Sequence, residues 1–233
     1  MKLIRRATGI LPEDVLVRLR DTVSEATCPA RTNVESSYYS TFWYDLETAP
    51  RNVVERIIRG ILRTRVPDSV RADLVGVEWW LGRLDAPFGT NFKFGVHRDF
   101  GQNPATGGFD SPLMSSVFFL TTLDDGALMV FQDVPDIESA EWDHQFPTAN
   151  TFAMFRGPLW HTVVNRSDFL DTPSTVVPGD LRLTITINWW HFRPSSDAGA
   201  PMKLVAADYT GEIYPELVSE LADYDPALLA HAG

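Results

Sequence analysis

The feature that most constrains the fold is a strict two-residue alternation of side chains over residues 181–190. The apolar side chains share one parity, and they are Leu181, Leu183, Ile185 and Ile187. The polar side chains share the other parity, and they are Arg182, Thr184, Thr186 and Asn188. Because successive side chains of a β-strand point to opposite faces, this run predicts a strand with one apolar and one polar face.

Short β-like runs separated by loops fill most of the chain after Pro67. We expect strands at 75–84, 91–99, 113–121, 127–132, 151–155, 161–164 and 181–190. Before them, one-sided apolar stripes predict a helix beginning near Pro12 and a second over 53–62, and a short helix is expected over 216–221. Helices followed by many short strands indicate an α+β fold, mainly β, with the helices packed on one face of a sandwich or barrel.

Charge and cysteine content restrict the class of protein. The chain has 20 Lys and Arg residues against 31 Asp and Glu residues, a formal net charge of -11, which argues against binding nucleic acid or an anionic membrane. The single cysteine, Cys28, excludes a disulfide scaffold. The charged residues 1–6 are not followed by an apolar segment, and no run approaches the roughly 18 apolar residues of a membrane span. We therefore expect a soluble, cytoplasmic protein.

Two of the five histidines lie in patterns typical of a metal site. On a strand, His97 and Asp99 point to the same side, so one imidazole and one carboxylate can reach a single ion. His161 follows a Gly-Pro turn and begins another β-like run. Two histidines and one carboxylate form the facial set of non-haem Fe(II) oxygenases, and zinc accepts the same ligands. These three residues therefore predict a metal site without specifying iron.

The polar face of the run 181–190 adds a second requirement. An arginine in a strand that is otherwise buried is costly unless it has an anionic partner. The planar guanidinium of Arg182 suits a carboxylate, and the hydroxyl of Thr184, two residues on, can donate to the same group. The sequence therefore predicts a carboxylate-binding site on this face.

The order His97-x-Asp99, His161, Arg182 resembles the Fe(II)/2-oxoglutarate-dependent oxygenases, nearest their prolyl-hydroxylase-like branch. Residues 123–128 are similar to the turn and strand that precede the distal histidine in that family. Residues 152–163 resemble its signature of a strand, Phe, a turn and His-x-Val. The resemblance covers residues 75–193 and leaves the N-terminal helices and the tail unassigned.

The resemblance implies a double-stranded β-helix, a cupin-like jelly roll, as a single domain over 1–233. Residues 1–66 would form a mostly helical buttress, 75–193 the catalytic core and 194–233 a C-terminal extension. It implies that His97, Asp99 and His161 hold Fe(II), and that 2-oxoglutarate chelates the metal while Arg182 and Thr184 bind its far carboxylate. With O₂, such enzymes convert 2-oxoglutarate to succinate and CO₂ and usually hydroxylate a C–H bond. The presence of Asp99 favours hydroxylation over halogenation.

One departure from the family pattern concerns the arginine. The interval between His161 and Arg182 is longer than in prolyl-hydroxylase-like enzymes, and residues 166–180 resemble an inserted loop. Arg166 is therefore a competing candidate for the carboxylate. Arg182 is preferred, because Arg-x-Thr on a strand resembles the family motif and Arg166 precedes a polar loop.

The substrate is the least determined part of the prediction. We expect a small molecule, with an amino acid or a related metabolite favoured, because three arginines flank the metal-binding elements. The candidate substrate residues are Arg83, Arg98, Arg156, Asn188 and Trp190. The sequence leaves open a protein-side-chain hydroxylase, a cupin-type metalloenzyme that does not use 2-oxoglutarate, and a non-catalytic jelly-roll binding module. His144 is expected in a solvated loop before Pro147, and His191 to have an ordinary role at a strand end.

Overall fold

The computed structural model describes residues 2–28, 40–86, 95–133, 141–195, 203–206 and 214–219. Several sequence expectations lie wholly or partly outside these ranges. They concern the beginning of the expected strand 91–99, the acidic loop residues 134–140, the end of the expected helix 216–221 and most of the C-terminal extension.

A seven-stranded sheet, the major sheet, forms the centre of the molecule. Its strand order is β1-β9-β6-β11-β3-β2-β12, with antiparallel neighbours except for the parallel pair β12 and β2. The strands are β1 (Arg5–Thr8), β2 (Ser40–Asp45), β3 (Gly76–Asp85), β6 (Met114–Phe119), β9 (Thr151–Arg156), β11 (Leu181–Trp190) and β12 (Lys203–Ala206). The alternating run 181–190 is therefore β11, and it pairs with β3 on one side and β6 on the other.

A three-stranded sheet, the minor sheet, has the order β10-β7-β8 and is antiparallel. Its strands are β7 (Ala127–Phe131), β8 (Trp142–Gln145) and β10 (Trp160–Val164). A short hairpin, β4 (Gly101–Gln102) with β5 (Phe109–Asp110), completes the described β-structure.

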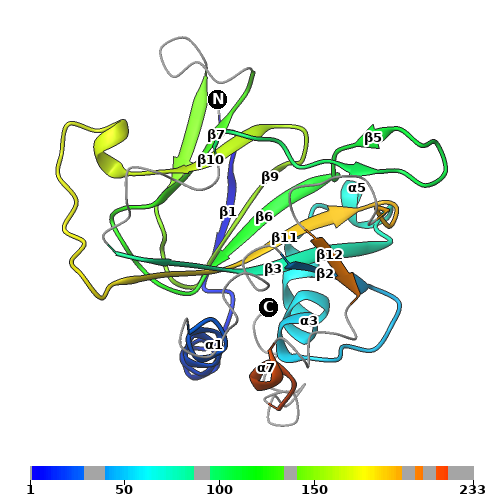
Figure 1. Cartoon of the computed structure of the whole chain (residues 1–233), viewed down its shortest axis with the longest axis horizontal. Helices are drawn as coiled ribbons and strands as arrows, with labels where there is room; N and C mark the ends of the chain where they lie inside the picture. Colours follow the sequence, from blue (N-terminus) through cyan, green and yellow to red (C-terminus); the bar gives the residue numbers. More distant parts are fainter. Residues whose placement is uncertain are drawn as a thin grey trace.

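The helices α1, α3 and α7 lie below β3 and β11 in Figure 1, on the face of the major sheet whose buried residues they contact, while β7 and β10 lie on its other side. The helical elements are α1 (Glu13–Ala26), α3 (Val53–Ile57), the π-helical turn η1 (Ile58–Leu62), α4 (Arg63–Arg65), α5 (Asp68–Arg71), the 3-10 turn η2 (Arg166–Asp168) and α7 (Pro215–Ser219). The expected helix over 53–62 corresponds to α3 and η1. Its first turn is capped by Asn52, whose Oδ1 accepts from the Glu55 backbone N–H at 2.9 Å.

Two apolar layers follow from the alternation along the strands. On the helix-covered face, Leu183, Ile185 and Ile187 of β11 pack with the buried residues of α1, α3 and η1. On the opposite face, Val117 and Phe119 of β6 pack with buried residues of β7 and β9. We call this second side the inner face, because the minor sheet covers it. The polar residues of β11 lie on the inner face, since Thr184 and Thr186 pair with Phe119 and Val117.

The expected α+β fold, mainly β with helices packed on one face, is confirmed in outline. The segment 1–66 is not only helical, because it also supplies β1 and β2 to the major sheet. Residues 95–99 form no regular strand, and His97 makes an isolated bridge instead. The expected loop after Asp133 contains β8, where Asp143 accepts hydrogen bonds from the backbone of Leu3 and Ile4.

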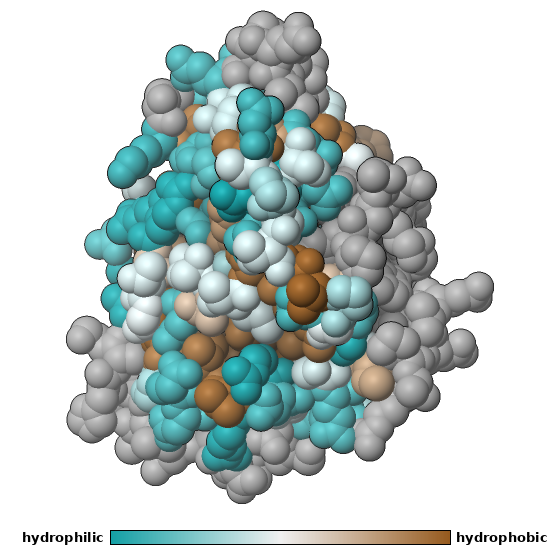
Figure 2. Space-filling model, turned by 90° about the vertical axis from the view of Figure 1, so that its left-hand side faces the viewer, coloured by the Kyte–Doolittle hydropathy of each residue, from teal (hydrophilic) through white to brown (hydrophobic). Residues whose placement is uncertain are grey.

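Hydrophilic side chains predominate on the side of the molecule shown in Figure 2, with small apolar areas among them. This side carries the polar connection 166–180 and α1, which extend to the left in Figure 1. Among the described helices, none combines the length and the apolar character needed to cross a bilayer.

Replacing Ile185 with alanine should destabilise the fold. Ile185 is fully buried at the centre of β11, in the layer between the sheet and the helices. The substitution should lower the free energy of unfolding by about 2–5 kcal/mol, measured by urea denaturation. Val177→Ala is the control, since this exposed side chain should contribute little. Equal effects of the two substitutions would contradict this account of the core.

Candidate metal centre

The backbone brings His97 and His161 together from distant parts of the chain. The His97 N–H donates to the His161 carbonyl at 3.0 Å, and the His161 N–H donates to the His97 carbonyl at 2.8 Å. This reciprocal pair is an antiparallel bridge between the segment before Asp99 and β10. The two imidazole rings consequently lie side by side, with centroids 4.4 Å apart.

Asp99 completes a group of three potential ligands. Its carboxylate oxygens lie 3.8 Å from His97 Nε2 and 3.4 Å from His161 Nε2. One ligand atom from each of the three residues lies within 4.8 Å of the others, close enough to contact one ion. His161 is buried, whereas His97 and Asp99 remain partly exposed, so the group can be reached from solvent.

Each histidine is oriented by a backbone carbonyl. His97 Nδ1 lies 2.7 Å from the Gly95 carbonyl, and His161 Nδ1 lies 3.1 Å from the Leu159 carbonyl. These contacts favour a proton on Nδ1 in both rings and leave each Nε2 lone pair directed toward Asp99. Carbonyl partners of this kind are typical of the outer shell of metal-binding histidines.

The charges of the three residues influence one another. Burial and the neighbouring His161 lower the pKa of His97, despite the Asp99 carboxylate. Burial also opposes protonation of His161, but Asp99 outweighs it and the pKa of His161 is raised. Burial opposes ionisation of Asp99, yet the two histidines hold its pKa below the usual range. Asp99 is therefore an ionised ligand at neutral pH.

The inner face of β6 and β11 supports Asp99 from behind. Ser115 Oγ donates to Asp99 Oδ2 at 3.4 Å, a long hydrogen bond. Asn188, which is opposite Ser115 in the strand register, also favours the charged form of Asp99. Asn188, a candidate substrate residue from the sequence, therefore lies on the inner face of β11 beside Asp99.

Arg182 lies on the same inner face, toward the other end of β11. Its Nε donates to the Gly126 carbonyl at 2.9 Å, and its guanidinium carbon lies 5.5 Å from the centroid of the Phe119 ring. The side chain is 5% exposed, and burial lowers its pKa to about 10. Among the residues that the structure describes, no carboxylate forms an ion pair with Arg182.

Thr184 lies beside Arg182 on the inner face, and its partner on the neighbouring strand β3 is Gly82. A Cβ atom added to Gly82 of β3 would lie 2.3 Å from Thr184 Oγ1. The absence of a side chain at Gly82 therefore leaves room for the Thr184 hydroxyl, which is itself buried.

Arg166 is excluded as the alternative to Arg182 by its position. Its Nε donates to Thr172 Oγ1 at 2.8 Å, and its guanidinium lies over the Phe146 ring. Phe146 packs on the outer side of the minor sheet, away from the three ligand residues. The guanidinium on the inner face is therefore that of Arg182.

Of the three arginines proposed for substrate, Arg83 and Arg156 point away from the inner face, whereas Arg98 lies between His97 and Asp99 in the chain. Arg83 has the parity of the helix-covered face and binds Asp85 and the Ser24 carbonyl in the last turn of α1. Arg156 follows Phe155, whose ring contacts His161, and therefore points to the opposite face. Arg98 is exposed and stacks on Trp160.

The remaining described histidines also have positions of their own. His144 was expected in a solvated loop, but it lies on β8 and its ring contacts Phe146 and Phe169. Burial lowers the pKa of His144. His191 is exposed after the end of β11 and contacts Phe192, in agreement with an ordinary role.

One acidic residue that the sequence analysis did not single out also lies on the inner face. Glu78 of β3 is opposite Asn188 in the register, and burial raises its pKa. The alternation of side chains over 76–85 could have placed Glu78 on this face from the sequence. The lack of a basic partner among the described residues could be seen only in the structure.

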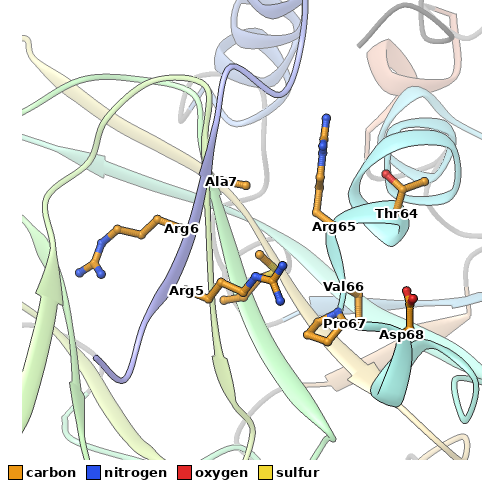
Figure 3. A pocket seen from close by; sticks show the side chains of 9 residues that line it. Arg5, Arg6, Ala7, Thr64, Arg65, Val66, Pro67 and Asp68 are labelled. Atoms are coloured by element: carbon orange, nitrogen blue, oxygen red, sulfur yellow. The ribbon is translucent and has the colours of Figure 1, made fainter. Parts of the chain in front are cut away.

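Cavity size does not identify this site. A cavity of about 470 Å³ lies between β1 and the segment 64–68, and Arg5 extends from β1 toward Val66 and Pro67 there (Figure 3). A second cavity, of about 430 Å³, is lined by the β5 end of the hairpin together with Arg156 and His191. Neither is lined by His97, Asp99 or His161, so the candidate site is defined by its ligand geometry and charges.

Comparisons with known proteins give matches among solved structures. A prolyl-4-hydroxylase from Pseudomonas putida matches with a TM-score of 0.47 and 14% identity, covering 84% of this chain and 88% of the other. A collagen prolyl hydroxylase from Paramecium bursaria Chlorella virus-1 matches with a TM-score of 0.46 and 12% identity, covering 81% and 89%. A non-haem α-ketoglutarate-dependent epimerase of nogalamycin biosynthesis matches with a TM-score of 0.48 and 13% identity, covering 84% and 82%.

No family model matches the sequence. No curated protein matches it.

Removing one of the three ligand residues should abolish tight metal binding. His97→Ala should weaken the affinity for Fe(II) more than about 100-fold, since even outer-shell changes commonly cost 10–100-fold. Anaerobic isothermal titration calorimetry measures this. The control is His191→Ala, which removes an exposed histidine outside the group and should bind as the wild type does. Unchanged binding by His97→Ala would exclude the assignment.

Proposed function

We propose that the protein is an Fe(II)- and 2-oxoglutarate-dependent oxygenase that hydroxylates an unactivated C–H bond of a small molecule. The observation that carries the proposal is the buried Arg182, which lacks an acidic partner among the described residues and shares the inner face with a His-Asp-His group. In this reading, the two facing sheets form a double-stranded β-helix.

The donor set fits iron. Two imidazole nitrogens and one carboxylate oxygen on one side of an ion leave its other positions for small ligands, as in the facial triad of non-haem iron oxygenases. His97 and His161 present Nε2 because their Nδ1 atoms face backbone carbonyls, and Asp99 is ionised. When bound, Fe(II) with 2-oxoglutarate and O₂ supplies the oxidising chemistry, leaving succinate and CO₂ from the cosubstrate.

Arg182 and Thr184 would bind the far carboxylate of 2-oxoglutarate. The guanidinium is fixed by its Nε hydrogen bond to Gly126, which leaves its terminal nitrogens as donors for a carboxylate. Gly126 immediately precedes β7, and His161 pairs with Val130 of the same strand. These positions are roughly 13 Å apart along the strand, and a dicarboxylate would lie between the Arg182 guanidinium and the metal.

The surroundings of the site restrict where charge is stabilised. Phe119 forms an apolar wall beside Arg182, and Phe155 covers one side of His161 with ring centroids 4.9 Å apart. In such a low-dielectric environment, an unpaired guanidinium attracts an anion more strongly than it would at the surface. These residues would bind and orient the cosubstrate and keep water away from its carboxylate.

The alternatives make different demands on Arg182. A zinc or iron enzyme of cupin type that does not use 2-oxoglutarate, or a non-catalytic binding module, requires no buried cation at this position. A protein-side-chain hydroxylase requires the same cosubstrate site and differs only in the substrate. The buried, unpaired Arg182 therefore favours 2-oxoglutarate use over the first two.

Arg182→Ala should uncouple cosubstrate binding from metal binding. Anaerobic Fe(II) and 2-oxoglutarate should give a weak visible charge-transfer band in the wild type. The variant should need at least about tenfold more 2-oxoglutarate for the same band, because it lacks two charge-assisted hydrogen bonds. Titration by visible spectroscopy gives both affinities, and succinate after admission of air gives the turnover.

Arg166→Ala is the matched control, since this arginine lies on the outer side of the minor sheet. It should retain the wild-type affinity for 2-oxoglutarate. A wild-type protein that binds Fe(II) but gives neither the band nor succinate with a panel of amino acids would exclude the proposed oxygenase.

A further inference from the structure

A second polar cluster lies on the inner face, at the opposite end of β11 from Arg182. Glu78 of β3 is opposite Asn188, whereas Leu84 of the same strand is opposite Arg182. Arg182 and Asn188 are six positions apart on β11, which corresponds to roughly 20 Å along the strand. Ser115, the residue that contacts Asp99, is the partner of Asn188 on β6. The Glu78 end is therefore the end at which the metal-binding group lies.

Glu78 is held in place by its neighbours on two strands, β2 and β11. Thr41 Oγ1 of β2 donates to Glu78 Oε1 at 2.6 Å. Asn188 and Trp190 of β11 both face the carboxyl and favour its charged form. Burial and the nearby charge of Asp99 act in the opposite direction, and the net pKa of Glu78 is raised. The carboxyl is thus fixed in position while its negative charge is poorly compensated.

No basic side chain compensates this carboxyl in the part of the chain that the structure describes, because none forms an ion pair with Glu78. Neighbouring polar atoms also lack partners. Asn188 Oδ1 and Trp190 Nε1 are buried, and neither atom has a partner at full hydrogen-bonding geometry. The two side chains are 2% and 1% exposed, whereas Glu78 retains part of its accessible surface. Unsatisfied buried polar atoms beside a carboxyl without a basic partner indicate a place for a polar ligand.

A purely structural role does not explain this arrangement well. A neutral Glu78 that served only to join β2 to β3 would accept from Thr41 and could donate its own O–H to Asn188 Oδ1, whereas an apolar residue would avoid the cost of its burial. It would not account for the Trp190 side chain, which faces the carboxyl and favours its charged form. The two acceptors, the Glu78 carboxylate and Asn188 Oδ1, together suit a group with several N–H donors and a positive charge.

We propose that Glu78, Asn188 and Trp190 form the substrate subsite of the oxygenase, and that this subsite binds a cationic amino group. The ammonium would donate to Glu78 and to Asn188 Oδ1, and the Trp190 N–H would support the charged carboxylate. The proposal rests on the oxygenase function given above, since it assigns the substrate for that metal centre. The net charge of -11 would also favour the approach of cations.

The test compares two probes that differ in charge. n-Butylammonium chloride and its neutral isostere 1-butanol are titrated into the metal-free full chain and followed by ligand-observed NMR. The wild type should bind n-butylammonium at least about tenfold more tightly than 1-butanol, as expected for a charge-assisted interaction. Equal affinity for the two probes in the wild type would overturn the proposal without recourse to any variant.

Glu78→Gln then locates the binding. This isosteric substitution removes the charge and keeps an acceptor for Thr41, so it should reduce n-butylammonium affinity about tenfold and leave 1-butanol binding unchanged. Glu47→Gln, which removes a negative charge from an exposed side chain, is the matched control and should bind as the wild type does. A loss of equal size in both variants would show a general charge effect and overturn the subsite.

The two levels of the proposal can fail separately. Glu78→Gln should give the wild-type charge-transfer band with Fe(II) and 2-oxoglutarate, because Arg182 and the three ligand residues are unchanged. A wild-type band combined with no preference for n-butylammonium would leave the oxygenase function standing and remove the amine subsite. An amine preference without any band would retain a cation site and remove the oxygenase function.

Discussion

The parity of side chains along β11 is the constraint on which the rest of the structure depends. β11 lies between β3 and β6, and the register with each strand sets which of their side chains share a face with those of β11. With Ile185 and Ile187 buried against the helices, Arg182 and Asn188 must point to the inner face. A slip of one residue would bury the polar set against the helices and remove the binding face altogether. Core packing and site chemistry are therefore two consequences of one alternation.

The second organising contact is the backbone bridge between His97 and His161. It joins a segment with no regular strand to β10, and thereby fixes the spacing of two imidazoles that are far apart in the sequence. The carbonyls of Gly95 and Leu159 then set which nitrogen of each ring faces Asp99. Main-chain hydrogen bonds therefore position the two histidines, and side-chain contacts with Ser115 and the histidine rings position Asp99.

The sequence allowed prediction of those features that depend on periodicity. The strand 181–190 and the helical run over 53–62 both follow from local spacing, whereas His97 and Asp99 lie close together although the strand from which that was predicted does not form over 95–99. β8 was not predicted, because Trp142–Gln145 does not alternate and its Asp143 is held by the distant backbone of Leu3 and Ile4. Parity would have excluded Arg83, which shares its face with Trp79 and Leu81. Glu78 could not be recognised, since the lack of a basic partner is a property of three strands together.

The inner face can also be considered as a balance of formal charges. In the proposed loaded site, the charges of Fe(II) and 2-oxoglutarate cancel, and so do those of Asp99 and Arg182. An ionised Glu78 would then be an uncompensated charge on this face, within reach of Asp99, whose charge opposes its ionisation. A cationic substrate would neutralise it at the point where burial makes an isolated charge most costly. Arg182 and Glu78 are thus two poorly compensated charges of opposite sign, located near opposite ends of β11. Arg182 would bind an anionic cosubstrate, and Glu78 would bind a cationic substrate.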